Sequence, residues 1–238
     1  MGKPYRLFNI LTEPQCDHRI HLPDSIESLL ATVGTKWRRS VRYNLKSFHQ
    51  SVKDFHLERI SDASLVDVCF DIITKISANS WQGKTFGVPN WTTVTWLKCW
   101  KEIANSGLLR SYILWADNKP VAYLLACEYN GTLYGQTFGY DLHFTKLAPG
   151  IVCLYYCLDD IMTYQPVRMF DFDFGTHVYK RTFANEEIES AVVFVSGSTK
   201  GTILAFLQRF LNRFVFRTKK LLQKWNLTNR IRKILKRK

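Results

Sequence analysis

The sequence predicts an α/β domain with a mixed central sheet, helices on both faces of the sheet, and a basic amphipathic helix at the C-terminal end. Three observations predict this arrangement. Helical periodicity dominates residues 25–106, alternating apolar residues follow over 109–140, and a further helix then precedes a further strand. Strands joined by short turns are antiparallel, whereas a helix between two strands makes a parallel crossover, so together they predict a mixed sheet.

The chain has 238 residues, of which 46% are hydrophobic, so it is long and apolar enough to bury a large single core. It contains no apolar run of the ~18 residues that a membrane span needs and no apolar run near Met1, which predicts a cytoplasmic protein without a signal peptide. We expect an N-terminal extension over 1–24, one domain over 25–199 and a helical tail over 200–238.

The six cysteines are expected to be reduced, and most of them to be small core residues. No cluster of ligands at short spacing indicates a metal site.

The first elements follow from capping residues and periodicity. Residues 1–24 have the character of a loop or short strand. Asp24 or Ser25 can cap a helix that runs to about His49 with a break near Gly34. The next expected elements are a strand over 52–60, a helix over 62–80 and a helix over 92–106 that Gly107 ends.

The following region is a three-stranded meander. Strands are expected over 109–116, 121–129 and 132–140, and Asn130-Gly131 is a strong signal for the second hairpin turn. After it we expect a helix from Pro149-Gly150 to about 164, a strand over 167–174, a helix over 178–185 and a strand over 191–195.

The net charge of +13 comes from the tail. Residues 200–238 hold 13 of the 33 cations and no acid, which leaves 33 − 13 = 20 cations against 20 acids in the rest of the chain. A surface that is basic throughout, as in many nucleic-acid-binding folds, is therefore not indicated.

One stretch of the sequence carries a family resemblance. Asp171-Phe172-Asp173-Phe174-Gly175 ends a predicted strand, Tyr179-Lys180 and Phe183 follow it, and Pro149-Gly150 opens the helix before it. Together with the meander segment 133–141 and a basic helix followed later by Trp81, this resembles the exopolysaccharide-biosynthesis (CelD-like) acetyltransferases. They are a branch of the GNAT superfamily related to Fem peptidoglycan transferases. The resemblance covers about residues 20–195. The chain departs from the family in having Asp173 where the first glycine of the motif usually stands and in lacking a longer N-terminal half.

The resemblance implies a GNAT-type sheet with an acyl-CoA donor, acetyl-CoA or a longer acyl-CoA, and no metal. The pyrophosphate of the acyl-CoA is expected at the start of the helix after the meander, where backbone N–H groups and the helix dipole favour an anion. Gly150 would let the backbone approach closely, and Pro149 presets the helix start. The donor residues expected from this match are Ala148, Pro149, Gly150 and Ile151. An ordinary helix start remains the alternative.

The predicted catalytic residues are Asp171, Asp173 and Tyr179. Strand alternation places both acids on one face and the neighbouring phenylalanines on the other, and acids on an apolar strand are costly unless that face is polar. One acid could accept a proton from the acceptor or orient Lys180, and a structural ion pair with Lys180 or Arg181 is the alternative. Tyr179 lies where a GNAT enzyme often has its general acid, and a buried structural tyrosine is the alternative.

Acceptor contacts are expected from several segments. Aromatic and cationic side chains on a loop suit a sugar, nucleotide or phosphate group, and a packed loop or a solvated helix face is the alternative for each. The residues expected to bind the acceptor are Trp81, Lys84, Gln136, Tyr140 and Lys180, with a further basic stripe at Arg38, Arg39, Arg42 and Lys46.

The tail is expected to be a basic amphipathic helix. Its cations Arg209, Arg213, Arg217, Lys220 and Lys224 share one side, which suits an anionic membrane surface. Packing against the domain and contact with RNA are the alternatives.

The function expected from the whole sequence is acyl-CoA-dependent N- or O-acyl transfer to a cell-envelope or polysaccharide precursor, by a cytoplasmic protein that is peripheral to the membrane. Two alternatives stay open. One is a Fem-like transferase that uses aminoacyl-tRNA, and the other is a non-catalytic GNAT-like protein in polysaccharide assembly.

Overall fold

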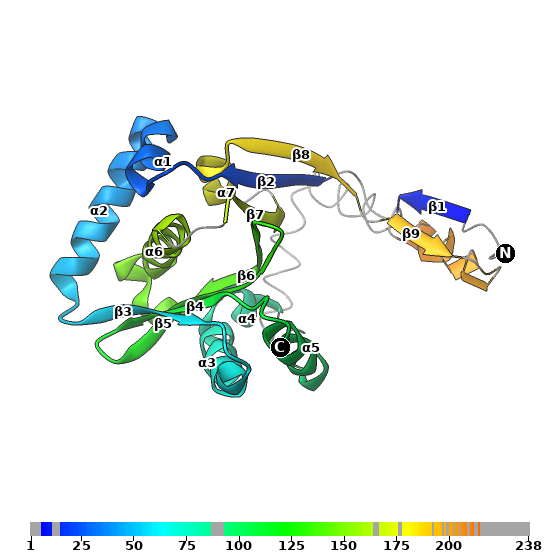
Figure 1. Ribbon diagram of the computed structural model, residues 1–238, viewed down its shortest axis with the longest axis horizontal. Helices are drawn as coiled ribbons and strands as arrows, with labels where there is room; N and C mark the ends of the chain where they lie inside the picture. The colour runs from blue at the N-terminus through cyan, green and yellow to red at the C-terminus, as the bar shows by residue number, and fades with distance from the viewer. Residues whose placement is uncertain are drawn as a thin grey trace, which may run out of the picture. The chain divides into compact units, whose positions relative to one another are not determined.

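The structure is a computed structural model that describes residues 6–10, 15–86, 93–163, 167–175, 178–191, 193–196, 198, 200–201, 203–204, 206–208, 210–211 and 214. The described residues form two compact parts (Figure 1). The larger is built on a seven-stranded sheet, and in the smaller one β1 (Arg6–Ile10) pairs antiparallel with β9 (Val193–Ser196).

The seven-stranded sheet is mixed, as the sequence predicts. In spatial order its strands are β3 (Phe55–Ile60), β4 (Ser111–Ala116), β5 (Lys119–Tyr129), β6 (Thr132–Tyr140), β7 (Met169–Phe174), β2 (Gln15–His21) and β8 (Glu186–Ser190). The pairs β3–β4, β4–β5 and β5–β6 are antiparallel, β2 is antiparallel to β7, and β6 and β7 are parallel. A crossover through a 3₁₀ segment (Leu142–Leu147) and α6 (Pro149–Thr163) joins the two parallel strands.

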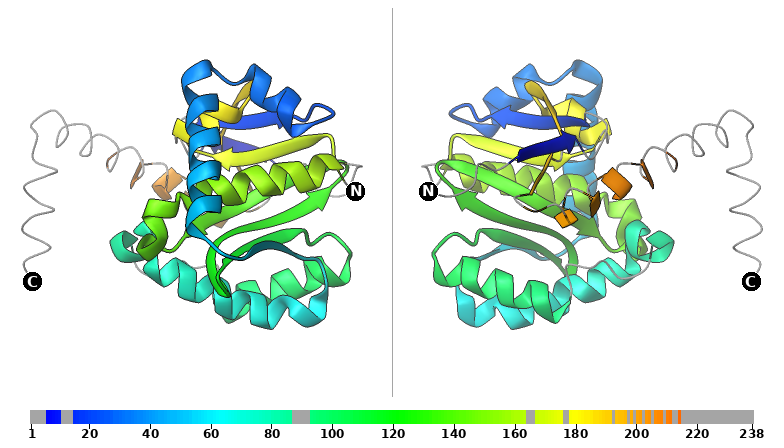
Figure 2. Two further views of the ribbon diagram at one scale, coloured as in Figure 1. Left: turned by 90° about the vertical axis from the view of Figure 1, so that its left-hand side faces the viewer. Right: turned by 90° about the vertical axis from the view of Figure 1, so that its right-hand side faces the viewer.

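Helices cover both faces of this sheet (Figure 2). On one face α6 lies across β4, β5 and β6, with α1 (Ile26–Thr32) and α2 (Thr35–Ser51) packed against it. On the other face lies α3 (Val66–Asn79), with α4 (Trp81–Phe86) and α5 (Val94–Asn105) beside it. The remaining helix, α7 (Val178–Phe183), connects β7 to β8.

Alternation along the meander strands explains the two faces. On β5, Ala122 and Leu124 belong to the core cluster under α6, whereas Tyr123 and Leu125 belong to the cluster under α3 and α5. Successive side chains of a strand point to opposite faces, so a strand that is apolar at every position must be covered on both sides. The continuous apolar run of β5 therefore accounts for the three-layer arrangement.

Local signals in the sequence place several boundaries correctly. The Ser25 hydroxyl caps α1 by accepting a hydrogen bond from the Ser28 N–H at 3.2 Å, and the helix breaks before Gly34 as expected. Asn130 and Gly131 both have positive φ, 50° and 74°, as a two-residue hairpin turn of this kind requires.

The segment 1–24, expected as a loop or short strand, supplies β2, which lies between β7 and β8 in the large sheet. Two other segments differ from the expectation. Residues 186–190, for which no element was expected, form β8. Trp81 and Lys84, expected on a loop, lie on the short helix α4. Neither short strand shows a clean period of two, because what defines them is pairing with distant segments.

Only part of the tail can be compared with its expected helix. The described residues from 200 to 214 are helical, and their large apolar side chains are exposed, namely Ile203, Leu204, Phe206, Leu207, Phe210, Leu211 and Phe214. The five cations expected on one side of the tail lie outside the described residues. Within the part of the chain that the structure describes, no helix has the length and apolar character needed to cross a membrane.

The junction between α3 and α4 depends on one glycine, and this gives a testable prediction. A Cβ added at Gly83 would lie 1.9 Å from the carbonyl oxygen of Ser77, so α4 would have to move away from α3. We expect Gly83→Ala to lower the free energy of unfolding by about 1–3 kcal/mol in urea denaturation. Gly34→Ala is the control, because nothing lies within 4 Å of its added Cβ, and it should cost less than about 1 kcal/mol. Equal losses in the two variants would contradict the prediction.

Candidate active site

The parallel strands β6 and β7 separate along their length. They are paired at Thr132 with Met169, Leu133 with Phe170, and Tyr134 with Asp171. Both strands continue beyond these positions, to Tyr140 and Phe174, without further paired residues among those described. Two neighbouring strands that diverge leave an opening in the middle of the sheet.

A β-bulge lies beside this opening. Leu125 of β5 pairs with Thr137 of β6, and the next residue, Ala126, pairs with Gly135, so Gln136 is the extra residue. Bulges bend a strand and increase its local twist. The bulge at Gln136 therefore helps to turn the second half of β6 away from β7.

A cavity of about 170 Å³ lies in the opening between β6 and β7. Typical small-molecule sites are about 300–1,000 Å³, so this cavity fits the reacting end of a ligand rather than a whole coenzyme. Several elements contribute to it: its lining residues are Gly135, Gln136, Thr137 and Phe138 of β6, Phe170, Phe172 and Asp173 of β7, Tyr179 and Lys180 of α7, Gln82 of α4, Leu124 of β5 and Leu154 of α6.

Tyr179 lines the cavity among aromatic rings. Its ring centroid lies 5.9 Å from that of Phe138 and 5.9 Å from that of Phe172. Burial raises the pKa of Tyr179 to about 12, so its hydroxyl stays protonated at neutral pH. Tyr179 can therefore donate a hydrogen bond in this cavity, but it is not suited to act as a base.

Lys180 is 7% exposed and fastens the end of β7. Its ammonium donates hydrogen bonds to the carbonyl oxygens of Phe172 at 2.5 Å and Asp173 at 3.1 Å. Burial lowers the pKa of Lys180, while the negative charges of Asp173, Asp17 and Asp171 oppose that shift. The lysine expected to bind the acceptor thus also holds two backbone carbonyls at the edge of the cavity.

Of the two acids predicted to be catalytic, Asp173 lines the cavity and Asp171 does not. Asp171 is 5% exposed, accepts a hydrogen bond from Nε of Arg19 at 2.8 Å and another from the N–H of Asp173 at 2.8 Å. Asp173 lines the cavity, and so do Phe170 and Phe172, which alternation had placed on the opposite face from the acids. Asp171 is therefore held in a structural ion pair, with Arg19 rather than with Lys180 or Arg181 as its partner.

The backbone of Asp173 explains why the simple alternation fails. Its φ is +58°, in the left-handed region that favours glycine, so the strand no longer alternates regularly at this residue. The family motif to which the sequence is similar usually has glycine at this position. Asp173 therefore has a glycine-like backbone conformation and is an acidic residue that lines the cavity.

The start of α6, where the sequence predicts the pyrophosphate of the donor, is closely packed. Pro149 and Gly150 are buried, and a Cβ at Gly150 would lie 3.2 Å from the ring of Tyr140. The N–H of Ile151 already donates to the carbonyl of Ala148 at 3.0 Å. The structure thus gives Gly150 a packing role against an aromatic ring, and these four residues do not line the cavity.

The remaining expected acceptor residues divide into two groups. Gln136 and Lys180 line the cavity, whereas Trp81, Lys84 and Tyr140 do not. Trp81 is 51% exposed, and its neighbour Gln82 takes the lining position instead. Sequence reasoning missed Gln82, because an uncharged polar residue in a short helix carries no signal of its own.

The raised pKa of Tyr179 predicts a change in alkaline stability. A buried phenol whose folded pKa is about 12 and whose unfolded pKa is about 10 stabilises the fold fully below pH 10 and loses that contribution as pH rises toward 12. We expect Tyr179→Phe to reduce the number of protons released on unfolding between pH 10 and 12 by about one. Unfolding free energies measured against pH in both proteins check this, and identical slopes would contradict it.

The sequence also matches a known family model. The model described as an acetyltransferase (GNAT) domain matches residues 35–181, which include most of the strands, α6 and both cavity residues of α7. The chain belongs to this GNAT acetyltransferase family. The opening between β6 and β7 is therefore part of the matched GNAT domain.

Solved structures share the fold of this GNAT domain at low sequence identity. A conserved protein of unknown function from Bacteroides thetaiotaomicron is 15% identical, with a TM-score of 0.53 over 81% of this chain and 62% of that one. FemX is 12% identical, with a TM-score of 0.52 over 78% of this chain and 60% of its own. The chain thus spans less than two thirds of the length of either structure. No curated protein matches the sequence.

Proposed function

We propose that this GNAT protein is an acyltransferase that moves an acyl group, such as acetyl, from acyl-CoA to an amine or hydroxyl of a cell-envelope or polysaccharide precursor. The observation that carries the proposal is the cavity between β6 and β7, with Tyr179 and Lys180 at its wall. The cavity is small and combines apolar and aromatic side chains with a few polar ones, which suits the thioester end of the donor.

Tyr179 would act on the leaving group. As the thioester C–S bond breaks, negative charge develops on sulfur, and a protonated hydroxyl nearby stabilises it. A phenol with a pKa of about 12 does not give up its proton readily to a thiolate whose own pKa is about 8.5. We therefore assign Tyr179 the role of hydrogen-bond donor to sulfur rather than that of a general acid.

Asp173 would act on the acceptor. Asp173 is half-buried and lines the cavity, so its carboxylate would accept the proton that an amine or hydroxyl loses as the new C–N or C–O bond forms. Lys180 would keep Asp173 in place through the backbone carbonyl of that residue. Asp171 would support the same turn through the N–H of Asp173 and take no part in proton transfer.

The acceptor class rests on the residues that resemble the polysaccharide branch of the family and on polar groups around the cavity. Gln136 and Gln82 line it from different elements and could hydrogen-bond a sugar. Trp81, Lys84 and Tyr140 would contact more distant parts of an acceptor, since they lie outside the cavity lining.

A transferase that uses aminoacyl-tRNA is a second candidate, favoured by the distribution of cations. Helix α2 carries five cations and no acid, and none of these cations forms an ion pair with another described residue. Such a surface attracts a phosphate backbone. A non-catalytic GNAT-like role in polysaccharide assembly is the third candidate.

We further propose a cytoplasmic protein that is peripheral to the membrane. Exposed apolar residues of the tail, such as Phe206 and Phe210, together with the 13 cations of residues 200–238, suit an anionic lipid surface. Sedimentation with anionic vesicles but not with neutral ones is the expected result.

Release of free CoA thiol tests the main proposal. Incubated with acetyl-CoA and a panel of amino-sugar precursors, the protein should release CoA only when an acceptor is present. Tyr179→Phe should slow this release by about 100-fold. Consumption of aminoacyl-tRNA without any use of acyl-CoA would favour the second candidate, and inactivity with both donors would favour the third.

A further inference from the structure

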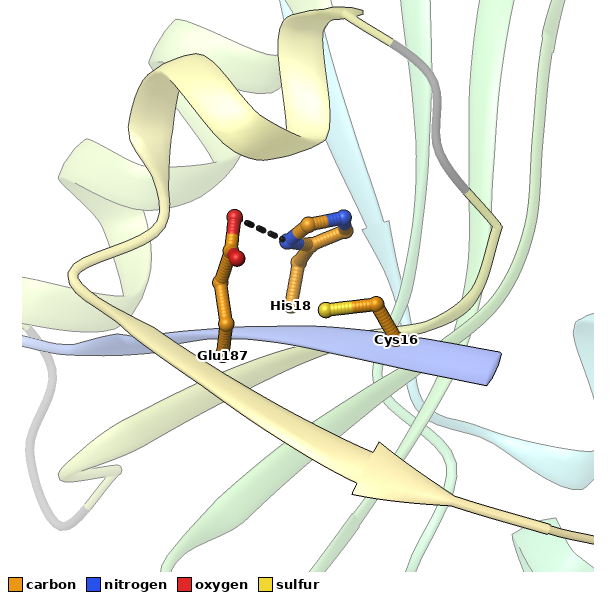
Figure 3. Close-up of side chains that lie close together, drawn as sticks. All are labelled: Cys16, His18 and Glu187. Carbon is orange, nitrogen blue, oxygen red and sulfur yellow. Dashed lines mark ion pairs between the residues drawn. The ribbon is translucent and has the colours of Figure 1, made fainter. Parts of the chain in front are cut away.

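Three potential metal ligands lie together on the neighbouring strands β2 and β8, apart from the cavity residues. Cys16 and His18 are two positions apart on β2, so their side chains leave the strand on the same face. Glu187 lies on β8, the next strand of the sheet. Figure 3 shows the thiol, the imidazole and the carboxylate turned toward one another.

His18 is buried in an unusual way. Its side chain is 1% exposed, and neither ring nitrogen makes a hydrogen bond to any other described residue, although Nδ1 lies within ion-pair distance of the Glu187 carboxylate. Burying a polar group without a hydrogen-bond partner destabilises the folded state. A ligand that accepts the lone pair of a ring nitrogen would remove this cost.

The spacing of the three side chains fits a metal ion. Nδ1 of His18 lies 3.4 Å from Oε1 of Glu187, and the ligand atoms of all three residues lie within 4.8 Å of one another. Two atoms bound to one tetrahedral zinc ion at about 2.0–2.3 Å are themselves about 3.4–3.7 Å apart. The histidine and glutamate are already at that separation, and the largest separation needs to close by about 1 Å.

We propose that Cys16, His18 and Glu187 bind one Zn²⁺ ion. Thiolate, imidazole and carboxylate together are ligands of zinc, whereas Ca²⁺ and Mg²⁺ prefer oxygen alone. Water would complete the four-coordinate shell on the side of Glu187, whose side chain is 52% exposed. This is the one group of three such residues found in the described part of the chain.

The ion pair that would compete with the metal for the Glu187 carboxylate is weak. Nε of Arg181 lies 3.7 Å from the same carboxylate oxygen of Glu187, and the two side chains are 66% and 52% exposed. Exposed pairs of this kind stabilise a fold only weakly, so a divalent ion displaces the arginine readily.

The metal would fasten β8 to β2 next to the site. Helix α7, which carries Tyr179 and Lys180, ends at Phe183 just before β8. Asn185 already ties the start of β8 to β2, because its side chain and backbone bond to His21 and Arg19 at 2.8–3.0 Å. Zinc at Glu187 would add a second tie two residues further along, and it would have a structural role rather than a chemical one.

Metal binding by the untagged full-length protein tests the proposal. After removal of metal with a chelator, Co²⁺ should bind at one ion per chain and give the near-ultraviolet charge-transfer band of a cobalt–thiolate bond. Cys16→Ser should abolish that band. Glu187→Gln, at a half-exposed side chain where folding is expected to survive, should weaken Zn²⁺ binding by about 100-fold, because even outer-sphere partners of a metal contribute about 10–100-fold.

Cys99→Ser is the matched control, since Cys99 is an exposed free thiol on α5. The buried thiols are poor competitors, since burial raises the pKa of Cys69 to about 12. The proposal is overturned if the wild-type protein shows no cobalt–thiolate band, or if Cys16→Ser and Cys99→Ser lose it equally. Unchanged Zn²⁺ affinity in Glu187→Gln would also overturn it.

Discussion

Replacing Lys180 with methionine is expected to damage both the fold and the site. Methionine has similar length but no donor, so the carbonyls of Phe172 and Asp173 lose the ammonium that bonds them at 2.5 and 3.1 Å. Hydrogen bonds to a charged group contribute about 1.5–3 kcal/mol each, but burial of the ammonium opposes this, as its lowered pKa shows. We expect a net loss of about 1–3 kcal/mol and at least about a 100-fold lower rate of acyl transfer.

Denaturant unfolding and the CoA-release assay measure the two effects of Lys180→Met separately. Lys146→Met is the control, because Lys146 is exposed on the neighbouring 3₁₀ segment. It should change neither stability nor rate by more than a small factor. A Lys180→Met protein that keeps full activity would show that the end of β7 does not need this lysine.

Filling the cavity is expected to abolish donor binding without unfolding the protein. Thr137 is half-buried on β6 and lines the cavity, so Thr137→Trp would place an indole in a space of about 170 Å³. The acyl end of the donor could then no longer enter between β6 and β7. We expect the affinity for acetyl-CoA to fall by at least about 100-fold, because the reacting end loses its whole binding site.

Val94→Trp is the matched control for the added indole. Val94 is 71% exposed on α5, on the opposite side of the sheet from α6. Its binding should equal that of the wild-type protein, and thermal unfolding of both variants should show that each is folded. Equal binding by Thr137→Trp and Val94→Trp would mean that the donor binds elsewhere.

The sequence predicted those parts of the fold that depend on local patterns. The hairpin at Asn130-Gly131, the Ser25 cap and the helix start at Pro149 all depend on residues close in the chain, and all three are confirmed. The GNAT-type mixed sheet is confirmed for the same reason, because the meander and the crossover helix follow one another directly along the chain.

Features made by distant segments could not be predicted in this way. Asp171 pairs with Arg19, which is 152 positions away, so alternation alone could not show that the carboxylate of Asp171 is held in an ion pair. His18 and Glu187 lie close together only because β2 is next to β8 in the sheet. The expectation of no metal site considered only ligands that are close together in the sequence. Asp173 lines the cavity, and its positive φ has no signal in a residue other than glycine.

The proposed mechanism depends on binding of acyl-CoA in the opening between β6 and β7, and calorimetric titration of the full-length protein with acetyl-CoA measures that binding. We predict that the wild-type protein and Val94→Trp each bind one acetyl-CoA per chain and that Thr137→Trp loses this binding. If the folded wild-type protein binds neither acetyl-CoA nor longer acyl-CoAs, the proposed acyl-CoA-dependent function is contradicted.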